Sequence, residues 1–224
     1  EEYLYYKTRL LNMCGIGLVN KDDEHAPQII KAANCELYTY SEESKEADFV
    51  ASDIRYVSQP DFVGTEFHIS GKYDMEVRLG IPGLFNVVNA LAAVSVCSFL
   101  GLDQARISHA LENIRVNGRM EIVYTSERCT VLVDYAHNAV SMESLLSTLR
   151  DYKPKRLVCV FGCGGNRSKD RRYSMGEIGG KMADLSIITA DNSRYEKVED
   201  IIADIRGSIE KTGGKFIEIP DRRE

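Results

Sequence analysis

The second half of the chain alternates between short apolar runs and helix-like segments. The expected strands are residues 121–125, 130–133, 156–161, 185–189 and 215–219, and the expected helices are residues 141–151, 174–183 and 198–210. Strands that alternate with helices form parallel strands joined by right-handed crossovers, which predicts an open α/β sheet. Ligands bind such sheets beyond the carboxyl ends of the strands. This rule selects three loops, at residues 134–138, 162–172 and 191–194.

The first half predicts a more mixed α/β unit that is rich in strands. We expect helices at residues 1–11, 27–33, 87–100 and 103–114, and strands at residues 14–20, 36–40, 49–57, 65–70 and 75–79. The helix over 87–100 is apolar on nearly every side, as a buried helix should be, and Asn86 is placed to cap it. We therefore predict two domains, residues 1–116 and 117–224.

Composition and charge exclude several classes of protein. Hydrophobic residues make up 44% of the chain and charged residues 28%, which is typical of a globular protein. The net charge of −6 argues against general binding to nucleic acid or to an anionic membrane. No apolar run reaches the roughly 18 residues of a membrane span. The six cysteines lie mostly in apolar strings without a Cys-x-x-Cys pair, which favours reduced, buried thiols. We expect a cytoplasmic monomer.

Both ends of the sequence resemble interrupted helices. The chain opens at Glu1 inside a helix-like segment, and Asp221 and Glu224 have the spacing of a capping box at the start of another helix. We therefore expect a fragment of a longer protein.

The three selected loops carry the residues that could do chemistry. Asp134 and His137 follow a strand, where they could serve a reaction or only organise the loop. Gly162 opens a glycine-rich loop in which Arg167 replaces the third glycine of a dinucleotide fingerprint. Arginine and lysine side chains close to exposed N–H groups suit carboxylates or phosphates, although a solvated basic turn is the alternative. The basic residues are Arg167, Lys169, Arg171 and Arg172.

Two further features have an ordinary and a functional interpretation. Asp191-Asn192-Ser193-Arg194 follows the next strand and faces the same crevice, although Asp and Asn in a turn often bond their own backbone. Lys7 falls four residues after Tyr3 and four before Leu11, on an apolar stripe where a lysine usually extends its amine to water.

An ordered set of motifs resembles the Mur ligases of bacterial cell-wall synthesis over nearly the whole chain. The matching pieces are Glu2-x-x-x-x-Lys7, Asn20-x-Asp22-Asp23, Gly83-x-Phe85-Asn86-x-x-Asn89, Gly118-Arg119-x-Glu121, Asp134-Tyr135-Ala136-His137, Phe161-Gly162-Cys163-Gly164-Gly165-Asn166-Arg167, Met175-Gly176 and Asp191-Asn192-x-Arg194. One such piece is weak evidence, whereas the ordered set is specific.

The resemblance implies a remnant of a central ATPase α/β domain, followed by a Rossmann-like open-sheet domain. The implied activity is an ATP-dependent amide ligase that uses Mg²⁺. Its reaction adds meso-diaminopimelate, or L-lysine, to UDP-N-acetylmuramoyl-L-alanyl-D-glutamate in peptidoglycan synthesis. The family's P-loop would lie before Glu1, so we expect this chain alone to be inactive.

The resemblance also implies roles for individual residues. Asn86 and Asn89 would contact adenine, Asp134 the ribose, and Arg119 and His137 the phosphate region. Lys7 aligns with a lysine that is carbamylated in the family, and a carbamate suits Mg²⁺. Lys7, His137 and Arg119 are therefore the catalytic candidates. The residues implied for the incoming amino acid are Arg167, Asp191, Asn192 and Arg194.

Three other functions remain open from the sequence. Asp-Tyr-Ala-His-Asn also occurs in cyanophycin synthetase, a related amide ligase. The Gly162 loop leaves a dinucleotide-dependent oxidoreductase as an alternative from another class. A non-catalytic binding module is the third.

Overall fold

The computed structural model describes residues 2–59 and 61–224 and divides the chain into two compact units. The first unit ends at Val133 and the second is Asp134–Glu224. The predicted domain boundary, between residues 116 and 117, lies ahead of this division and stays a prediction.

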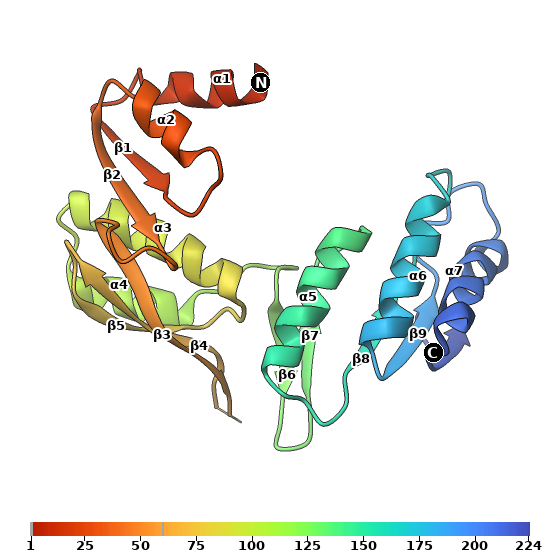
Figure 1. Cartoon of the computed structure of the whole chain (residues 1–224). Helices are drawn as coiled ribbons and strands as arrows, with labels where there is room; N and C mark the ends of the chain where they lie inside the picture. The colour runs from red at the N-terminus through yellow and green to blue at the C-terminus, as the bar shows by residue number, and fades with distance from the viewer. Residues whose placement is uncertain (1, 60) are drawn as a thin grey trace. The chain divides into compact units, whose positions relative to one another are not determined.

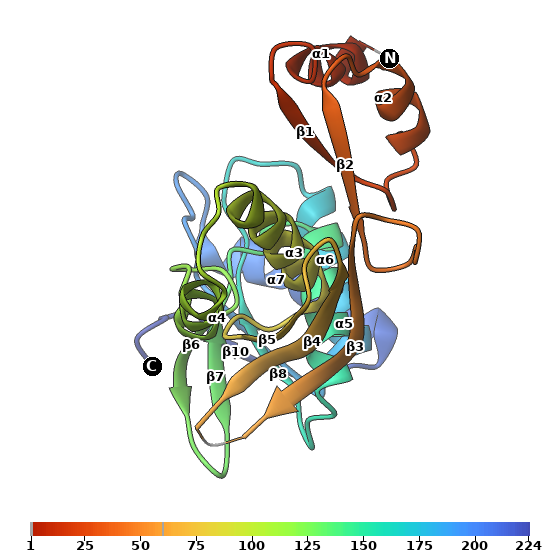
Figure 2. The same cartoon turned by 90° about the vertical axis from the view of Figure 1, so that its left-hand side faces the viewer.

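A five-stranded mixed sheet forms the frame of the first unit. Its strands are β1 (Ile16–Asn20), β2 (Glu36–Ser41), β3 (Phe49–Ser58), β4 (Val63–Gly71) and β5 (Met75–Leu79), in the order β1-β2-β3-β4-β5. β1, β2 and β3 run parallel, whereas β3, β4 and β5 are antiparallel neighbours. Figure 2 shows the long strands β3 and β4 side by side. In β5, buried and exposed residues alternate, as in a strand with one face on the core.

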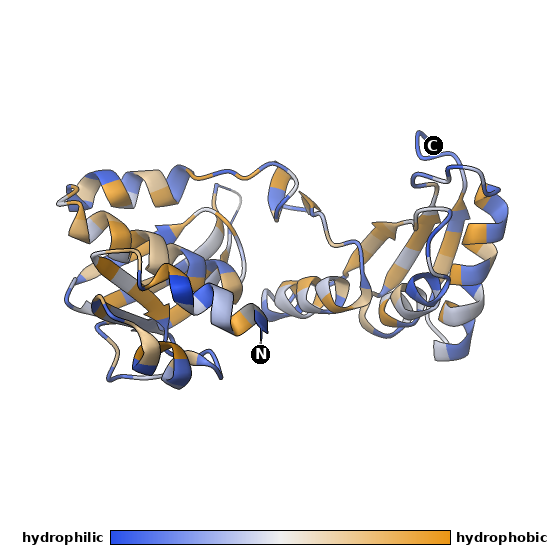
Figure 3. Ribbon diagram, turned by 90° about the horizontal axis from the view of Figure 1, so that it is seen from above, coloured by the Kyte–Doolittle hydropathy of each residue, from blue (hydrophilic) through white to orange (hydrophobic). Residues whose placement is uncertain are grey.

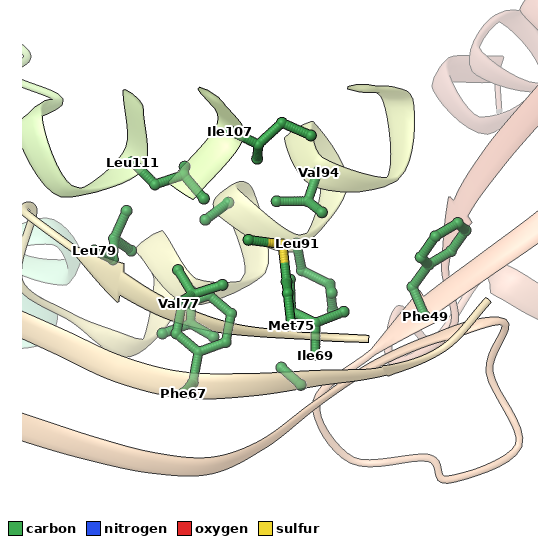
Figure 4. Close-up of a cluster of buried hydrophobic side chains, with 13 residues drawn as sticks. Phe49, Phe67, Ile69, Met75, Val77, Leu79, Leu91, Val94, Ile107 and Leu111 are labelled. Atoms are coloured by element: carbon green, nitrogen blue, oxygen red, sulfur yellow. The ribbon is translucent and has the colours of Figure 1, made fainter. Parts of the chain in front are cut away.

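Two helices cover one face of this sheet and close its core. They are α3 (Leu84–Phe99) and α4 (Gln104–Asn113), while α1 (Glu2–Leu10) and α2 (Ala26–Ala32) lie beside β1 and β2. Leu91 of α3 and Leu111 of α4 belong to one buried cluster with Phe67 and Ile69 of β4 (Figure 4). Full burial of one such side chain contributes roughly 1.5–3 kcal/mol. This packing holds α3, which carries two of the predicted site residues, firmly against the sheet.

The start of α3 differs from the prediction. Gly83, not Asn86, occupies the N-cap position, at φ 107°, and Asn86 lies inside the first turn. The Asn86 amide Nδ2 donates to the Pro82 carbonyl at 2.7 Å. Asn86 is therefore a clamp on the preceding loop rather than a cap.

A β-hairpin follows α4. It consists of β6 (Glu121–Thr125) and β7 (Thr130–Val133), which are antiparallel and end as predicted.

The second unit confirms the predicted parallel sheet. β8 (Val158–Phe161), β9 (Leu185–Thr189) and β10 (Phe216–Ile219) are parallel in the order β10-β9-β8, with β9 central. The connecting helices are α5 (Ala139–Asp151), α6 (Asp170–Met182) and α7 (Val198–Thr212). The strands are predominantly hydrophobic (Figure 3), and α6 and α7 lie side by side (Figure 1). The carboxyl ends of β8 and β9 therefore meet at one edge, with α6 and α7 beginning after them.

A further difference concerns the second unit. α6 begins at Asp170, four residues before the predicted start at Ser174. The segment from Asp221 forms a turn in which the Arg223 N–H donates to the Asp221 side chain, and the helix start expected there stays a prediction. The predicted N-terminal helix is present as α1, while Glu1 lies outside the described residues. No helix in the part that the structure describes is long and apolar enough to cross a membrane.

Candidate functional site

Two loops interlock at the carboxyl ends of β8 and β9. The Gly165 N–H donates to the Asn192 carbonyl at 2.8 Å, and the Tyr195 N–H donates to the Asn166 side-chain oxygen at 3.1 Å. The Arg194 side chain adds a third bond between the loops, in which Nη1 donates to the Gly165 carbonyl at 2.9 Å. The two loops, residues 162–169 and 190–197, thus lie against each other at the strand ends that the strand-end rule selects.

Glycine at position 165 is required for this close approach. A Cβ there would collide with the Ser193 carbonyl oxygen, whereas a Cβ at Gly164 would have only an ordinary contact, 3.6 Å from the Asn192 carbonyl oxygen. Asn166 and Arg194 both have left-handed backbones, at φ 52° and 51°. Such a conformation is uncommon for arginine and costs roughly 1–3 kcal/mol where the surroundings enforce it.

A buried arginine lies under these loops. The Arg172 side chain is 1% exposed, and its Nη2 donates to both Glu196 carboxylate oxygens at 2.8 Å. Its Nη1 donates to Asp204 on α7 at 2.9 Å, and Lys169 also pairs with Asp204 at 3.3 Å. Arg172 was predicted in the accessible basic cluster. That prediction is wrong, because Arg172 is in the first turn of α6 and faces the core.

Glu196 connects the buried arginine to the glycine-rich loop. Its Oε1 accepts a hydrogen bond from the Asn166 N–H. This backbone hydrogen bond, followed by the bond from Arg172, holds the pKa of Glu196 below its ordinary value. Glu196 is therefore ionised at neutral pH.

The four residues predicted for the amino acid lie on the interlocked loops. Arg167, Asp191, Asn192 and Arg194 are all exposed. Guanidinium groups on an exposed rim suit carboxylate groups through paired charge-assisted hydrogen bonds. The structure thus brings the Arg167 loop and the Arg194 loop together, as predicted.

The loop before α5 is organised by its own side chains. The Asp134 carboxylate accepts from the Ala136 N–H at 2.8 Å, and Asn138 caps α5 through the Ser141 N–H at 2.9 Å. His137 is exposed and its Nδ1 lies 3.1 Å from the Tyr135 carbonyl. Asp134 therefore does organise the loop. A hollow of about 650 Å³ lies close by, lined by the first turns of α5 and α6.

The remaining predicted residues belong to the first unit. Asn89 lies on α3 one turn after Asn86 and is exposed, as is Arg119 in the loop before β6. Lys7 of α1 is also exposed, whereas Leu11, which lies just after the helix, is buried. The side chain of Tyr3 lies outside the described residues.

Within residues 2–59 and 61–224, no group of three or more His, Cys, Asp or Glu side chains could hold a metal ion. Magnesium bound near Lys7 would therefore need ligands in addition to those described.

The two halves of the chain match two models of one protein family. Residues 1–97 match the Mur ligase middle domain, and residues 118–224 match the Mur ligase glutamate ligase domain. The chain belongs to the Mur ligase family. Membership confirms the resemblance read from the motifs and argues against a dinucleotide-dependent oxidoreductase.

Curated Mur ligases align with the whole chain. The UDP-N-acetylmuramoyl-L-alanyl-D-glutamate--2,6-diaminopimelate ligase 2 of Clostridium acetobutylicum is 38% identical over all 224 residues, and the ligase of the same activity from Alkaliphilus oremlandii is 39% identical over the whole chain. The chain spans 46% and 45% of these relatives, about half of their length.

Solved Mur ligases share the fold. A solved UDP-N-acetylmuramoyl-L-alanyl-D-glutamate--2,6-diaminopimelate ligase is 32% identical with a TM-score of 0.72, covering 99% of this chain and 46% of that one. A folylpolyglutamate synthase from Thermotoga maritima, 20% identical, matches with a TM-score of 0.70 over 91% of this chain and 47% of its own, which shows the fold alone.

Proposed function

We propose that this chain provides the middle and C-terminal parts of an ATP-dependent ligase that adds meso-diaminopimelate to UDP-N-acetylmuramoyl-L-alanyl-D-glutamate. The observation that carries the proposal is the loop Asp191-Asn192-Ser193-Arg194, held against the Arg167 loop by hydrogen bonds. The names of the curated relatives support it. The ligase acts in the cytoplasm as a monomer, on a UDP-muropeptide and a diamino acid.

The proposed reaction forms one amide bond at the expense of one phosphoanhydride. ATP transfers its terminal phosphoryl group to the D-glutamyl carboxylate, and ADP leaves. The amine of the incoming amino acid attacks the acyl phosphate and loses a proton, and the tetrahedral intermediate releases inorganic phosphate. The protein's contribution to such a reaction is positioning and neutralisation of charge.

The residues proposed for ATP lie on both units. Asn86 and Asn89 contact adenine, Asp134 contacts the ribose, and Arg119 and His137 neutralise the phosphate region. The exposure of Asn89, Arg119 and His137 supports these roles, because a ligand can reach them.

Lys7 is proposed to be carbamylated. Mg²⁺, which is usual in the family, would neutralise the phosphate oxygens, and a carbamate on Lys7 would be one of its ligands. The described residues do not assemble the rest of the ion's coordination.

Arg194 is proposed to select diaminopimelate over L-lysine. The two amino acids differ by one carboxylate at the far end of the side chain, which a guanidinium can bind through two parallel hydrogen bonds. Charge-assisted hydrogen bonds contribute roughly 1.5–3 kcal/mol, or a selectivity of about ten- to a hundredfold. Ser193 stands where the family motif has proline, so the αL backbone of Arg194 is held here by its loop contacts.

The test measures kcat/KM for both amino acids with the complete ligase that contains this chain. We expect a preference for diaminopimelate that Arg194→Ala removes. Arg206→Ala, which changes a partly exposed, ion-paired arginine on α7, should leave the preference unchanged. A wild-type preference for lysine would contradict the proposal, as would selectivity that survives Arg194→Ala. Absence of any UDP-linked product would favour another amide ligase, such as cyanophycin synthetase.

A further inference from the structure

The second unit contains a buried ion-pair cluster that touches three elements. Arg172 comes from α6, Glu196 from the loop after β9, and Asp204 from α7. Arginine is rarely fully buried unless its charge is paired, and here two carboxylates pair with it. The cluster fixes the end of the β9 loop relative to the start of α6.

The two carboxylates differ in what else they bind. Asp204 pairs with Arg172 and Lys169. In Glu196, the same oxygen, Oε1, accepts a hydrogen bond from the Arg172 guanidinium and one from the Asn166 N–H of the glycine-rich loop. Glu196 therefore links the buried Arg172 guanidinium to the backbone of the opposite loop, and it fixes the distance between them.

The backbone held in this way is the one that presents the two arginines. Asn166, which immediately precedes Arg167, has a left-handed backbone and accepts from the Tyr195 N–H, one residue after Arg194. Arg194 itself is left-handed and reaches Gly165. An arginine in this conformation persists only where surrounding contacts enforce it.

We propose that Glu196, anchored by Arg172, is a positioning residue for substrate selection. It holds the 162–169 and 190–197 loops in the register that directs Arg167 and Arg194 toward the distal carboxylate of the amino acid. Glu196 acts through the loop backbones and has no contact with the reacting atoms. This inference rests on the proposed function for its substrate, whereas the coupling of the loops does not depend on it.

The first arm of the test measures amide hydrogen exchange in the chain itself. Glu196→Ala should accelerate exchange at the Gly165 and Tyr195 amides by about tenfold or more, because these hydrogen bonds join the two loops. Asp204→Asn is the matched control: it removes the other carboxylate of Arg172 and leaves the Glu196–Asn166 bond. Unchanged exchange in Glu196→Ala, or equal acceleration in both variants, would overturn the inference.

The second arm measures the complete ligase. Glu196→Ala should raise KM for diaminopimelate by about tenfold, with KM for ATP unchanged, since the loss concerns the orientation of one substrate. Glu196→Gln keeps an acceptor for the Asn166 N–H and should recover part of this loss.

Asp204→Asn should lower the thermal stability without raising KM for diaminopimelate. A rise in KM for diaminopimelate in Asp204→Asn equal to that in Glu196→Ala would overturn the inference. A wild-type enzyme that prefers lysine would instead contradict the proposed function, and the exchange arm would still decide whether the loops are coupled.

Discussion

Gly165 has no side chain, and the backbone of the neighbouring loop occupies the space where a side chain would begin. We expect Gly165→Ala to force the two loops apart, because its Cβ would collide with the Ser193 carbonyl. Overpacking of this kind costs typically 1–3 kcal/mol of stability. Thermal or denaturant unfolding measures the loss, and binding of diaminopimelate to the ligase should weaken in parallel.

Gly164 provides a control for this prediction one residue away. A Cβ at Gly164 would lie 3.6 Å from the Asn192 carbonyl oxygen, an ordinary contact, so Gly164→Ala should retain stability close to that of the wild type. Equal destabilisation by the two substitutions would show that the loop requires glycine for a reason other than the collision with Ser193.

Arg172 shows what a charge run in a sequence does not reveal. Four basic residues within residues 167–172 predict an exposed cluster. The carboxylates that pair with the buried Arg172 belong to Glu196 and Asp204, which lie 24 and 32 residues further along the chain. Helical spacing could have indicated the burial of Arg172, because Arg172 falls three and four residues before Met175 and Gly176, which are buried on α6. The early start of α6 at Asp170 places Arg172 on that buried face.

Among the elements, β8 and the loop after it shield two thiols from water, since Cys163 is buried and Cys159 is partly buried. Burial raises the pKa of Cys159 and of Cys163 to about 11, whereas Cys129, in the turn of the β6–β7 hairpin, is exposed. At pH 8 only about one in a thousand thiols with such a pKa is ionised, and the thiolate is the reactive form. We expect iodoacetamide to modify Cys129 well before Cys159 or Cys163.

Peptide mass spectrometry of the folded chain checks this order of modification, with a denatured sample as the control in which all three thiols react. Modification of Cys163 as fast as Cys129 in the folded chain would show that the β8 loop opens readily, contrary to the interlocked geometry.

The sequence predicts strands more accurately than helix starts. β5, β6, β7 and β9 have the predicted ends, because apolar residues with clear turn signals delimit them. α3 begins three residues before its predicted start, and α6 begins four residues before its own. In each case the first turn is fixed by contacts that sequence spacing does not show: the Asn86 clamp on Pro82 in α3 and the ion pairs of Arg172 in α6.

For the molecule as a whole, the alternation of strands and helices predicted more of the candidate site than composition did. The strand-end rule selected the Arg167 and Arg194 loops, and the structure joins them by hydrogen bonds. Glu196 was missed, since it is an ordinary residue in a polar turn until its partners on α6 and on the opposite loop are known. The roles proposed for Lys7, Arg119 and the ATP residues stay predictions, and they concern residues of both units.

The two units should respond differently to acid. In the second unit, hydrogen bonds from cationic side chains and backbone N–H groups hold four carboxyl groups at pKa values below their ordinary range; they are Glu177, Asp184, Glu196 and Asp204. In the first unit, burial and then the charge of Asp22 raise the pKa of Glu42. The two kinds of shift have opposite consequences for stability.

A lowered pKa in the folded state gives stability that is fully present above the ordinary value and is lost as the pH falls through the lowered one. A raised pKa gives stability that is present below the ordinary value of 4.5 and is lost as the pH rises through the raised one. We therefore expect acidification below pH 4.5 to destabilise the second unit more than the first. Hydrogen exchange measures this difference. It is read by mass spectrometry from peptides of each unit, between pH 7 and pH 3, with correction for the intrinsic exchange rate.

Glu196→Gln should reduce the acid sensitivity of the second unit, since it removes one of the four titrating groups. Loss of protection in the first unit at a higher pH than in the second would show that other groups control its stability.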